Sequence, residues 1–332
     1  MKRLALIALA IFGFTSHQAS AEPKVLNVAR AFGIAYLPLI IMERDHLVEK
    51  QAAKAGVADL SVNWVTLGSG EALNSALLSR SIEIAVGGVP SLLTLWAKTQ
   101  TNIGVRGIAA ISSMPMFLNT RNPNVHTIAD FTEADRIALP GVKISVHAVT
   151  LQMAAAAAFG PSNFAKLDPI TVTMSHPSGL AALLSGKTEI TAHFTSSPFQ
   201  ELELANPDIH RVLSSYDVLG GSHTFSAAWT TNAFHTESPK TFAAFRTALA
   251  EAMKVIEADP AAAAQAYIDT SHDKIAAADL VKIIVDPNVR FTTTPERTMQ
   301  YAEFMSGIKS IPTKPTTWQD LFFDDGSLGG GS

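Results

Sequence analysis

The chain has 332 residues, a net formal charge of −4 and no cysteine. These properties exclude a thiol nucleophile, cysteine metal ligands and a cysteine-linked lipid anchor, and the lack of a basic run argues against nucleic acid or an anionic membrane as a partner. The length suits two domains of ~100–200 residues each, whose cores can do without disulfides even in an exported protein.

Residues 1–21 have the features of a secretory signal peptide. Lys2 and Arg3 precede the apolar run 4–14, and Ala19-Ser20-Ala21 forms an A-x-A cleavage site. The apolar run is shorter than the ~20 residues that a membrane span needs. We therefore expect cleavage after residue 21 and a periplasmic mature chain; a buried N-terminal helix is the alternative.

Strands and helices alternate along the predicted mature chain. Strands are predicted at 24–29, 60–67, 82–86, 143–146, 170–174 and 189–194. Helices are predicted at 35–56, 71–77, 92–97, 147–160, 180–185, 239–258 and from 260 onward. A strand followed by a helix and another strand indicates a parallel sheet. The predicted fold class is therefore α/β.

One short phrase occurs twice in the chain. ALLSRSIEIA covers 76–85 and ALLSGKTEIT covers 182–191, and in both places a predicted helix precedes the phrase and a strand follows it. A chance match of common residues is the alternative. We interpret the repeat as two lobes that share one α/β plan.

The loops that follow the predicted strands are candidates for ligand contacts. In open α/β sheets ligands bind outside the carboxyl ends of the strands, where helix N-termini present unpaired N–H groups. Here those loops carry glycine, serine and threonine, with a few aromatic and imidazole groups between them. Such a set suits a small polar or anionic ligand, although for any single loop helix capping alone explains the same residues.

Catalytic patterns are weak in this sequence. Ser69 lacks the glycine two residues earlier that a nucleophile elbow requires, and the G-x-G at 68–70 lacks the third glycine of a dinucleotide fingerprint. The histidines show no metal-ligand spacing, so we expect no metal and no cofactor. His147 and His193 follow predicted strands and either face a cleft or are structural. Ser69 with one of these histidines is the one catalytic pair that an exported enzyme could use.

The order and spacing of these segments resemble the periplasmic solute-binding proteins of ABC importers. Within them the chain is similar to the nitrate/sulfonate/taurine-type group, which includes relatives of the thiamine-pyrimidine binders. The resemblance is carried by VARAFGIAYLPLIIMERDHLVEK, LGSGEALNSALLSRSIEIAVGGVPSLL, VKISVHAVTLQMAAAAAFG and GLAALLSGKTEITAHFTSSPFQ, with the C-terminal helices from 237 onward. Together these segments cover most of the mature chain.

The resemblance implies a two-lobed periplasmic binding protein fold of type II with two hinge-crossing strands, near Met116 and Ala227. Lobe 1 would comprise 22–115 and 224–325, lobe 2 would comprise 116–223, and 326–332 would be a flexible tail. It implies a non-enzymatic monomer that delivers its ligand to an ABC permease in the inner membrane. Pyrimidine synthases on this fold use a cysteine-rich motif that this chain lacks.

The resemblance also implies ligand contacts from the loops described above. Tyr36 would cover one face of the ligand, and hydroxyl and N–H groups would hold its polar end. Arg30 is the one arginine near these loops, so a sulfonate- or nitrate-like ligand and a heteroaromatic ligand are both open. The predicted ligand-binding residues are Gly33, Tyr36, Gly68, Ser69, Ser91, Met114, His147, Thr150, His193 and Ser196.

Overall fold

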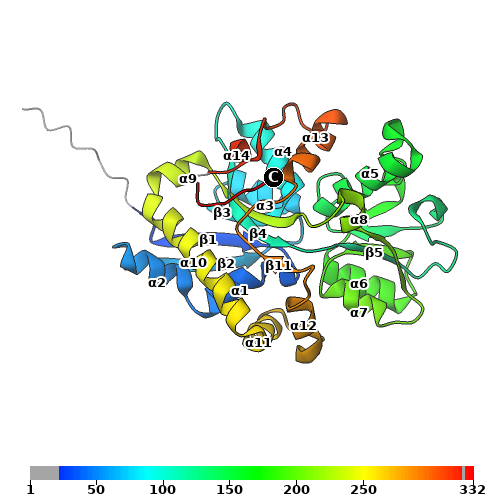
Figure 1. Ribbon diagram of the computed structural model, residues 1–332, viewed down its shortest axis with the longest axis horizontal. Coiled ribbons are helices and arrows are strands. Elements are labelled where there is room, and N and C mark those ends of the chain that lie inside the picture. The colour runs from blue at the N-terminus through cyan, green and yellow to red at the C-terminus, as the bar shows by residue number, and fades with distance from the viewer. Residues whose placement is uncertain (1–21, 324–325) are drawn as a thin grey trace, which may run out of the picture.

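A computed structural model describes residues 22–323 and 326–332. The predicted signal peptide lies outside the described residues. No helix within the described ranges has the length and apolar character of a membrane span. Figure 1 shows two lobes side by side, each a twisted sheet covered by helices. The α/β, two-lobed fold class predicted from the sequence is therefore confirmed.

Lobe 1 contains a six-stranded sheet of order β11-β4-β10-β3-β1-β2. Its strands are β1 (Val25–Arg30), β2 (Ser61–Thr66), β3 (Ile84–Gly88), β4 (Arg106–Ser113), β10 (Thr224–Thr230) and β11 (Arg290–Phe291). Its helices are α1 (Leu37–Arg44), α2 (Leu47–Lys54), α3 (Gly70–Leu78), α4 (Val89–Thr99), α9 (Asn232–Glu237), α10 (Pro239–Ala258), α11 (Pro260–Ser271), α12 (Ala277–Ile284), α13 (Thr298–Gly307) and α14 (Trp318–Leu321).

Lobe 2 contains a five-stranded sheet of order β7-β6-β8-β5-β9. Its strands are β5 (Phe117–Thr120), β6 (Ile137–Leu139), β7 (Thr171–Thr173), β8 (Ala192–Thr195) and β9 (His210–Ser214). Its helices are α5 (Val146–Phe159), α6 (His176–Ser185), α7 (Phe199–Leu204) and α8 (Ser215–Leu219). Short 3₁₀ turns lie at Ile34–Tyr36 in lobe 1 and at Ile128–Asp130, Pro161–Asn163 and Asp168–Ile170 in lobe 2.

The repeated phrase occupies the same place in both lobes. It joins α3 to β3 in lobe 1 and α6 to β8 in lobe 2. In each sheet the strand after the phrase has a parallel neighbour on one side, β1 or β6, and an antiparallel neighbour on the other, β10 or β5. The inference of a duplicated plan is therefore confirmed by the topology.

Two local predictions are wrong. The helix predicted over 35–56 is two helices, because His46 adopts a left-handed backbone (φ 50°) between α1 and α2. The predicted strand at 143–146 is a turn that leads into α5, and Lys143 has φ 75°. The sheet strand lies earlier, at β6. Neither break is marked by glycine or proline at the position concerned.

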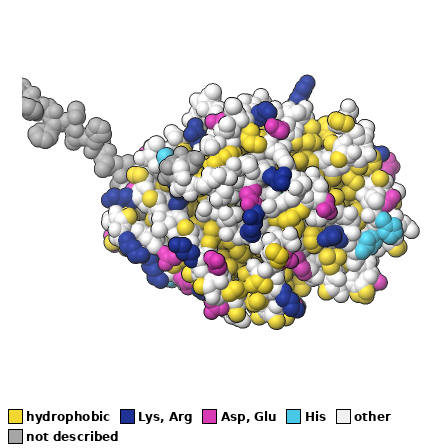
Figure 2. All heavy atoms as spheres, viewed as in Figure 1, with side chains coloured by type: hydrophobic (Ala, Val, Ile, Leu, Met, Phe, Trp, Pro, Cys, Tyr) yellow, Lys and Arg dark blue, Asp and Glu magenta, His cyan; other side chains and the backbone are white. Residues whose placement is uncertain are grey.

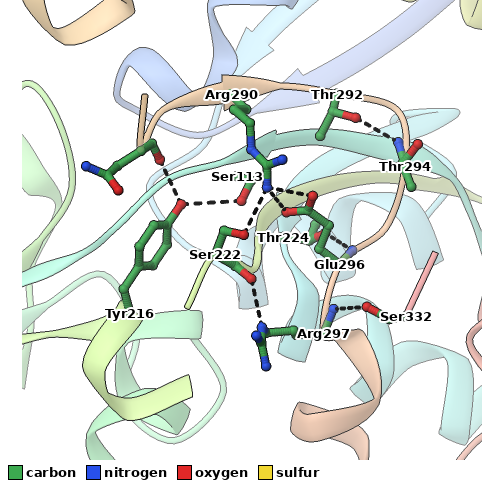
Figure 3. Close-up of polar contacts among 11 residues, drawn as sticks. Ser113, Tyr216, Ser222, Thr224, Arg290, Thr292, Thr294, Glu296, Arg297 and Ser332 are labelled. Atoms are coloured by element: carbon green, nitrogen blue, oxygen red, sulfur yellow. Dashed lines mark hydrogen bonds and ion pairs between the residues drawn. The ribbon is translucent and has the colours of Figure 1, made fainter. Parts of the chain in front are cut away.

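Two crossovers join the lobes. The first is the short segment 114–116 between β4 and β5, and the second runs through α8 to β10. Ala227, which the sequence places at the hinge, lies inside the lobe 1 sheet. Figure 3 shows how the second crossover is tied to lobe 1: Arg290 Nη2 donates to Ser222 Oγ (2.9 Å), Arg297 Nε donates to the Ser222 carbonyl (3.1 Å), and Tyr216 donates to the carbonyl of Asn288 (2.7 Å).

Residues 326–332, which the sequence predicts to be a flexible tail, pack against lobe 1. Leu328 is buried, and the Ser332 carbonyl accepts from the backbone N–H of Thr298 at 2.8 Å. Ser332 Oγ also accepts from the backbone N–H of Arg297 at 2.9 Å (Figure 3). These bonds satisfy donors at the N-terminus of α13, which explains why a Gly/Ser-rich segment is held in place.

Helix α13 contacts both lobes. It packs against α4 in lobe 1 and α5 in lobe 2. The Tyr301 hydroxyl lies 3.2 Å from Thr150 Oγ1, and the rings of Phe304 and Phe164 meet edge to face with centroids 6.4 Å apart. The C-terminal part of the chain therefore connects the lobes at a third place besides the crossovers.

Candidate functional site

A small cavity of about 40 Å³ lies where the two lobes meet. Ligand pockets typically have volumes of ~300–1,000 Å³, so a ligand of metabolite size can enter only when the lobes separate. Lobe 1 contributes Ala31, Phe32, Tyr36, Gly68, Ser69, Gly70, Leu73, Gly87, Gly88, Ser91 and Phe225, and lobe 2 contributes Pro140, Ser145, Val146, His147 and His176.

Four helices begin around this cavity. Ser69 caps α3 by accepting from the backbone N–H of Ala72 (3.2 Å), and Ser145 caps α5 by accepting from that of Ala148 (3.1 Å). Helix α4 starts after Gly88, and α6 starts at His176. Helix N-termini carry unpaired N–H donors and the positive end of the helix dipole. Two helices from each lobe therefore direct hydrogen-bond donors toward one space.

Glycines allow the walls of the cavity to approach each other. A Cβ atom at Gly70 would lie 2.0 Å from Ser91 Oγ, and one at Gly88 would lie 2.9 Å from the Cβ of Val146. The second contact crosses from lobe 1 to lobe 2. A larger residue at either position would displace the neighbouring side chain or keep the lobes apart.

Both ring nitrogens of His147 are buried at this cavity without a protein partner in the described part of the chain. The side chain is 2% exposed, and neither ring nitrogen forms a hydrogen bond within the described residues. Burial, with the neighbouring His193 and His223, holds the pKa of His147 well below its usual range, so the imidazole is neutral. A buried polar group without a partner costs ~1–3 kcal/mol, so the site retains an unfavourable group that a ligand could satisfy.

Aromatic rings surround the imidazole. Phe225 meets the rings of both Tyr36 (centroids 6.5 Å apart) and His147 (5.8 Å) edge to face. Phe194 meets the His147 ring in the same manner at 5.4 Å. Burial raises the pKa of the Tyr36 phenol, which therefore stays protonated. The cavity thus combines apolar walls with a few polar groups, as small-molecule sites do.

No lysine or arginine lines the cavity among the described residues. Arg30 forms an ion pair with Glu43 (Nη2 to Oε2, 2.6 Å), and its guanidinium lies over the Trp64 ring at 5.6 Å. Negative charge on a ligand would therefore be stabilised by N–H groups and helix dipoles rather than by a cation.

Of the ten residues predicted to bind ligand, the structure brings Tyr36, Gly68, Ser69, Ser91 and His147 to the cavity. Gly33 and Ser196 face each other across the lobe interface outside its lining, beside a hydrogen bond from the Ile34 N–H to the Ser197 carbonyl (3.0 Å).

The remaining three predicted residues do not line the cavity. Met114 is buried in the first crossover. Thr150 Oγ1 donates to the Val146 carbonyl (2.7 Å), as threonines inside helices often do. His193 lies behind His176, with its Nδ1 at 2.5 Å from Glu203 Oε1.

The sequence interpretation missed His176, Ser145, Phe32 and Phe225. The internal repeat contains a signal for the first of these. Ser69 precedes the first residue of α3, and Ser175 precedes His176, the first residue of α6, at the equivalent place in lobe 2. Applying the repeat to the loop at 68–70 would therefore have pointed to 174–176, the loop that contains His176.

Alanine at two of the predicted positions should have different consequences. Ser69→Ala removes an N-cap at the cavity, so we expect about 1 kcal/mol lower stability together with weaker ligand binding. Thr150→Ala removes contacts to Val146 and Tyr301 outside the cavity, so we expect lower stability and a smaller loss of affinity than in Ser69→Ala. Urea unfolding and ligand titration of both variants measure the two effects separately. Equal loss of affinity in both variants would contradict this assignment.

The candidate catalytic pair is not assembled. Ser69 forms no hydrogen bond to His147 or His193 among the described residues, and its Oγ accepts from the backbone N–H of Ala72 on α3. His193 is engaged by Glu203 and His176. A serine nucleophile needs a base within hydrogen-bond reach, and this arrangement supplies none.

Two larger cavities lie elsewhere. One of about 890 Å³ lies beside α10 and α14 of lobe 1, and another of about 580 Å³ lies at the lobe interface, between α7 of lobe 2 and α12 of lobe 1. Neither is lined by His147 or by the starts of four helices. The small cavity around His147 is therefore the candidate site.

No family model matches the chain, and no curated protein matches it. Solved structures do match. The alkanesulfonate-binding protein SsuA from Xanthomonas axonopodis pv. citri, bound to MOPS, is 17% identical with a TM-score of 0.70, over 88% of this chain and 96% of that one. The nitrate-binding protein NrtA from Synechocystis PCC 6803 is 15% identical with a TM-score of 0.69, over 90% and 85% of the two chains.

A third similar structure comes from a fungus. A Candida albicans gene product described as having the generic periplasmic binding protein fold is 15% identical with a TM-score of 0.65, over 92% of this chain and 99% of that one. The resemblance predicted from the sequence agrees with these neighbours. At such identities the likeness shows the fold, and the chain has the two-lobed periplasmic binding protein fold.

Proposed function

We propose that this chain is the extracytoplasmic solute-binding component of an ABC importer. In this role it would capture a small polar or anionic organic solute between its lobes and deliver it to a permease in the inner membrane. The observation that carries the proposal is His147, which is buried between the lobes with two unpartnered ring nitrogens. Neighbours of the same fold that bind alkanesulfonate or nitrate support it.

Binding between lobes explains how a solute would change the protein. Contacts to α3 and α4 from lobe 1 and to α5 and α6 from lobe 2 form together only when the lobes are closed. A ligand therefore shifts the population toward the closed state by its differential affinity for it. The closed form would present a surface to the permease that the open form lacks. The face shown in Figure 2 carries basic and acidic side chains interspersed.

The chemistry of the site restricts the solute. Aromatic walls suit a compact organic group or a flat ring, and the helix N-termini suit an oxyanion or another hydrogen-bond acceptor. We propose a sulfonate- or nitrate-like anion or a small heteroaromatic compound. We also propose that the protein acts as a periplasmic monomer and that the hydrophobic N-terminus directs its export.

Thermal unfolding of the mature protein with nitrate, aliphatic sulfonates including taurine, and aminopyrimidines tests the proposal. A ligand at ~100 times its dissociation constant adds ~2.7 kcal/mol of stability, which shifts the melting temperature clearly. Native mass spectrometry of the purified protein searches for a compound that co-purifies. Stabilisation without product formation supports a binding protein. Turnover of a stabilising compound would instead favour an exported enzyme.

A further inference from the structure

Three buried side chains form a row that leads away from the cavity. His176 lines the cavity, and its Nδ1 lies 3.3 Å from Nε2 of His193. Nδ1 of His193 lies 2.5 Å from Oε1 of Glu203. His176 is 4% exposed, and the other two are fully buried. The row therefore connects a carboxyl group in the interior of lobe 2 to the candidate site.

The fold builds this row from three elements. Asn119 on β5 lies opposite His193 on β8, so both side chains lie on one face of the sheet, where α7 supplies Glu203. Asn119 Nδ2 donates to Glu203 Oε2 at 2.9 Å. On α6, a Cβ at Gly179 would lie 2.5 Å from Nε2 of His193. The glycine therefore provides the space that the His193 ring needs to reach His176.

The Thr195 hydroxyl determines which nitrogen of His193 carries a proton. Its one hydrogen-bond partner among the described residues is Nδ1 of His176 at 2.9 Å, so the hydroxyl donates to that nitrogen. Nε2 of His193 faces the same Nδ1 at 3.3 Å, and two acceptor nitrogens at that distance repel each other unless a proton lies between them. A proton is therefore on Nε2 of His193. On its other side the His193 ring is held by Glu203, which Asn119 holds in turn.

That proton determines the tautomer of His176. Nε2–H of His193 points at Nδ1 of His176, and the Thr195 hydroxyl lies 2.9 Å from the same Nδ1. Burial, with the neighbouring His147 and His193, holds the pKa of His176 well below its usual range, so the ring carries a single proton. With Nδ1 acting as an acceptor, the proton of His176 is on Nε2. Nε2 has no protein partner within the described residues.

We propose that Glu203 and His193 are positioning residues that fix His176 as a hydrogen-bond donor to the ligand, which must therefore present an acceptor such as an oxyanion oxygen at this point. The inference rests on the proposed function, because it takes the cavity between the lobes as the ligand site. In this tautomer His176 presents an N–H donor to the cavity, as the helix N-termini around it do. A ligand group that offers only N–H donors would find no complementary atom there.

Nitrogen NMR of the histidine rings tests, without any ligand, whether Glu203 and His193 fix the tautomer of His176. We call this arrangement of three side chains the relay. In the ¹⁵N-labelled wild-type protein we expect His176 to be protonated at Nε2 and bare at Nδ1. Glu203→Gln should preserve this tautomer, because its amide oxygen can accept from Asn119 while its NH₂ donates to Nδ1 of His193. Glu203→Leu removes the hydrogen bond to His193, so His176 should become a mixture of its two tautomers. Glu201→Leu, two residues earlier on α7 and outside the row, is the matched control and should leave His176 unchanged.

A pair of compounds of similar shape tests the consequence for binding. Methanesulfonate offers acceptors alone, whereas methanesulfonamide replaces one oxygen by an NH₂ donor. Wild type and Glu203→Gln should prefer methanesulfonate, and Glu203→Leu should bind it roughly 10- to 100-fold more weakly, as expected for a lost hydrogen bond to a charged group.

The outcomes separate the relay from the proposed function. Protonation of His176 at Nδ1 in the wild type, or an unchanged tautomer in Glu203→Leu, would overturn the relay even if a ligand binds. The wild-type spectrum and Glu203→Gln decide the direction of the relay if Glu203→Leu does not fold. The expected tautomers with no affinity for any compound of the panel would leave the relay standing and count against the proposed function.

Discussion

Replacing His147 by phenylalanine should stabilise the unliganded protein and remove most of its ligand affinity. The ring has neighbouring aromatic side chains and an adjoining cavity of about 40 Å³ that accommodates the larger residue. The substitution removes two buried nitrogens that have no partner, so we expect about 1 kcal/mol or more of added stability. Binding should weaken at least ~10-fold because the ligand loses its imidazole partner. Urea unfolding and calorimetric titration measure the two quantities.

His223 provides the matched control for this change. It is also a buried histidine, and burial lowers its pKa to about 4, but its ring nitrogens lie near Ser215 Oγ (2.9 Å) and the Thr224 carbonyl (3.2 Å). His223→Phe breaks these contacts and should destabilise the protein by ~1–3 kcal/mol. A loss of stability of the same size in His147→Phe would show that His147 is a structural residue.

Gly88→Ala should weaken ligand binding by keeping the lobes apart. Gly88 has φ −69° and ψ 146°, a conformation that alanine adopts without strain. Its new Cβ would lie 2.9 Å from Cβ of Val146 in the opposite lobe, which is closer than such atoms approach. Overpacking of this kind costs ~1–3 kcal/mol, here in the closed state alone. The apparent dissociation constant should therefore rise by roughly 5- to 150-fold.

Small-angle scattering and calorimetric titration measure the effect of Gly88→Ala. The radius of gyration with ligand present should be larger than that of the wild type, whereas the folded content should be unchanged. Gly307→Ala is the control, because a Cβ at Gly307 has no neighbour within 4 Å. Wild-type affinity and an unchanged scattering curve in Gly88→Ala would mean that the lobes do not approach each other at this point when ligand binds.

The strands and the two-lobed plan could be predicted because they depend on local composition and on the internal repeat. The run 60–67 contains β2, and the run 170–174 contains β7. The break at His46 could not be predicted, because it is a left-handed residue between two helices with no glycine or proline beside it. The left-handed turn at Lys143 was missed although Pro140 and Gly141 precede it, because the alternation of apolar and polar residues over 142–146 is typical of a strand.

The candidate site could be predicted only in part, because sequence order does not say which face of a strand or helix meets the cleft. Ser69 and His147 lie at the starts of α3 and α5, whose N-termini face the cavity. His193 lies near the end of a predicted strand and in the structure belongs to β8, where it is paired with Asn119 and faces α7. Thr150 lies one turn beyond the start of α5, far enough to meet Tyr301 instead of the cavity.

Helix α13 affects how long a bound ligand remains between the lobes. It packs against α4 of lobe 1 and α5 of lobe 2, so the lobes cannot separate without breaking one of these contacts. The hydroxyls of Tyr301 and Thr150 must then each be hydrated separately. The distance between the lobes is therefore set partly by α13 and not by the two crossovers alone. Substitutions on α13 could therefore change the residence time of a ligand without altering any residue that contacts it.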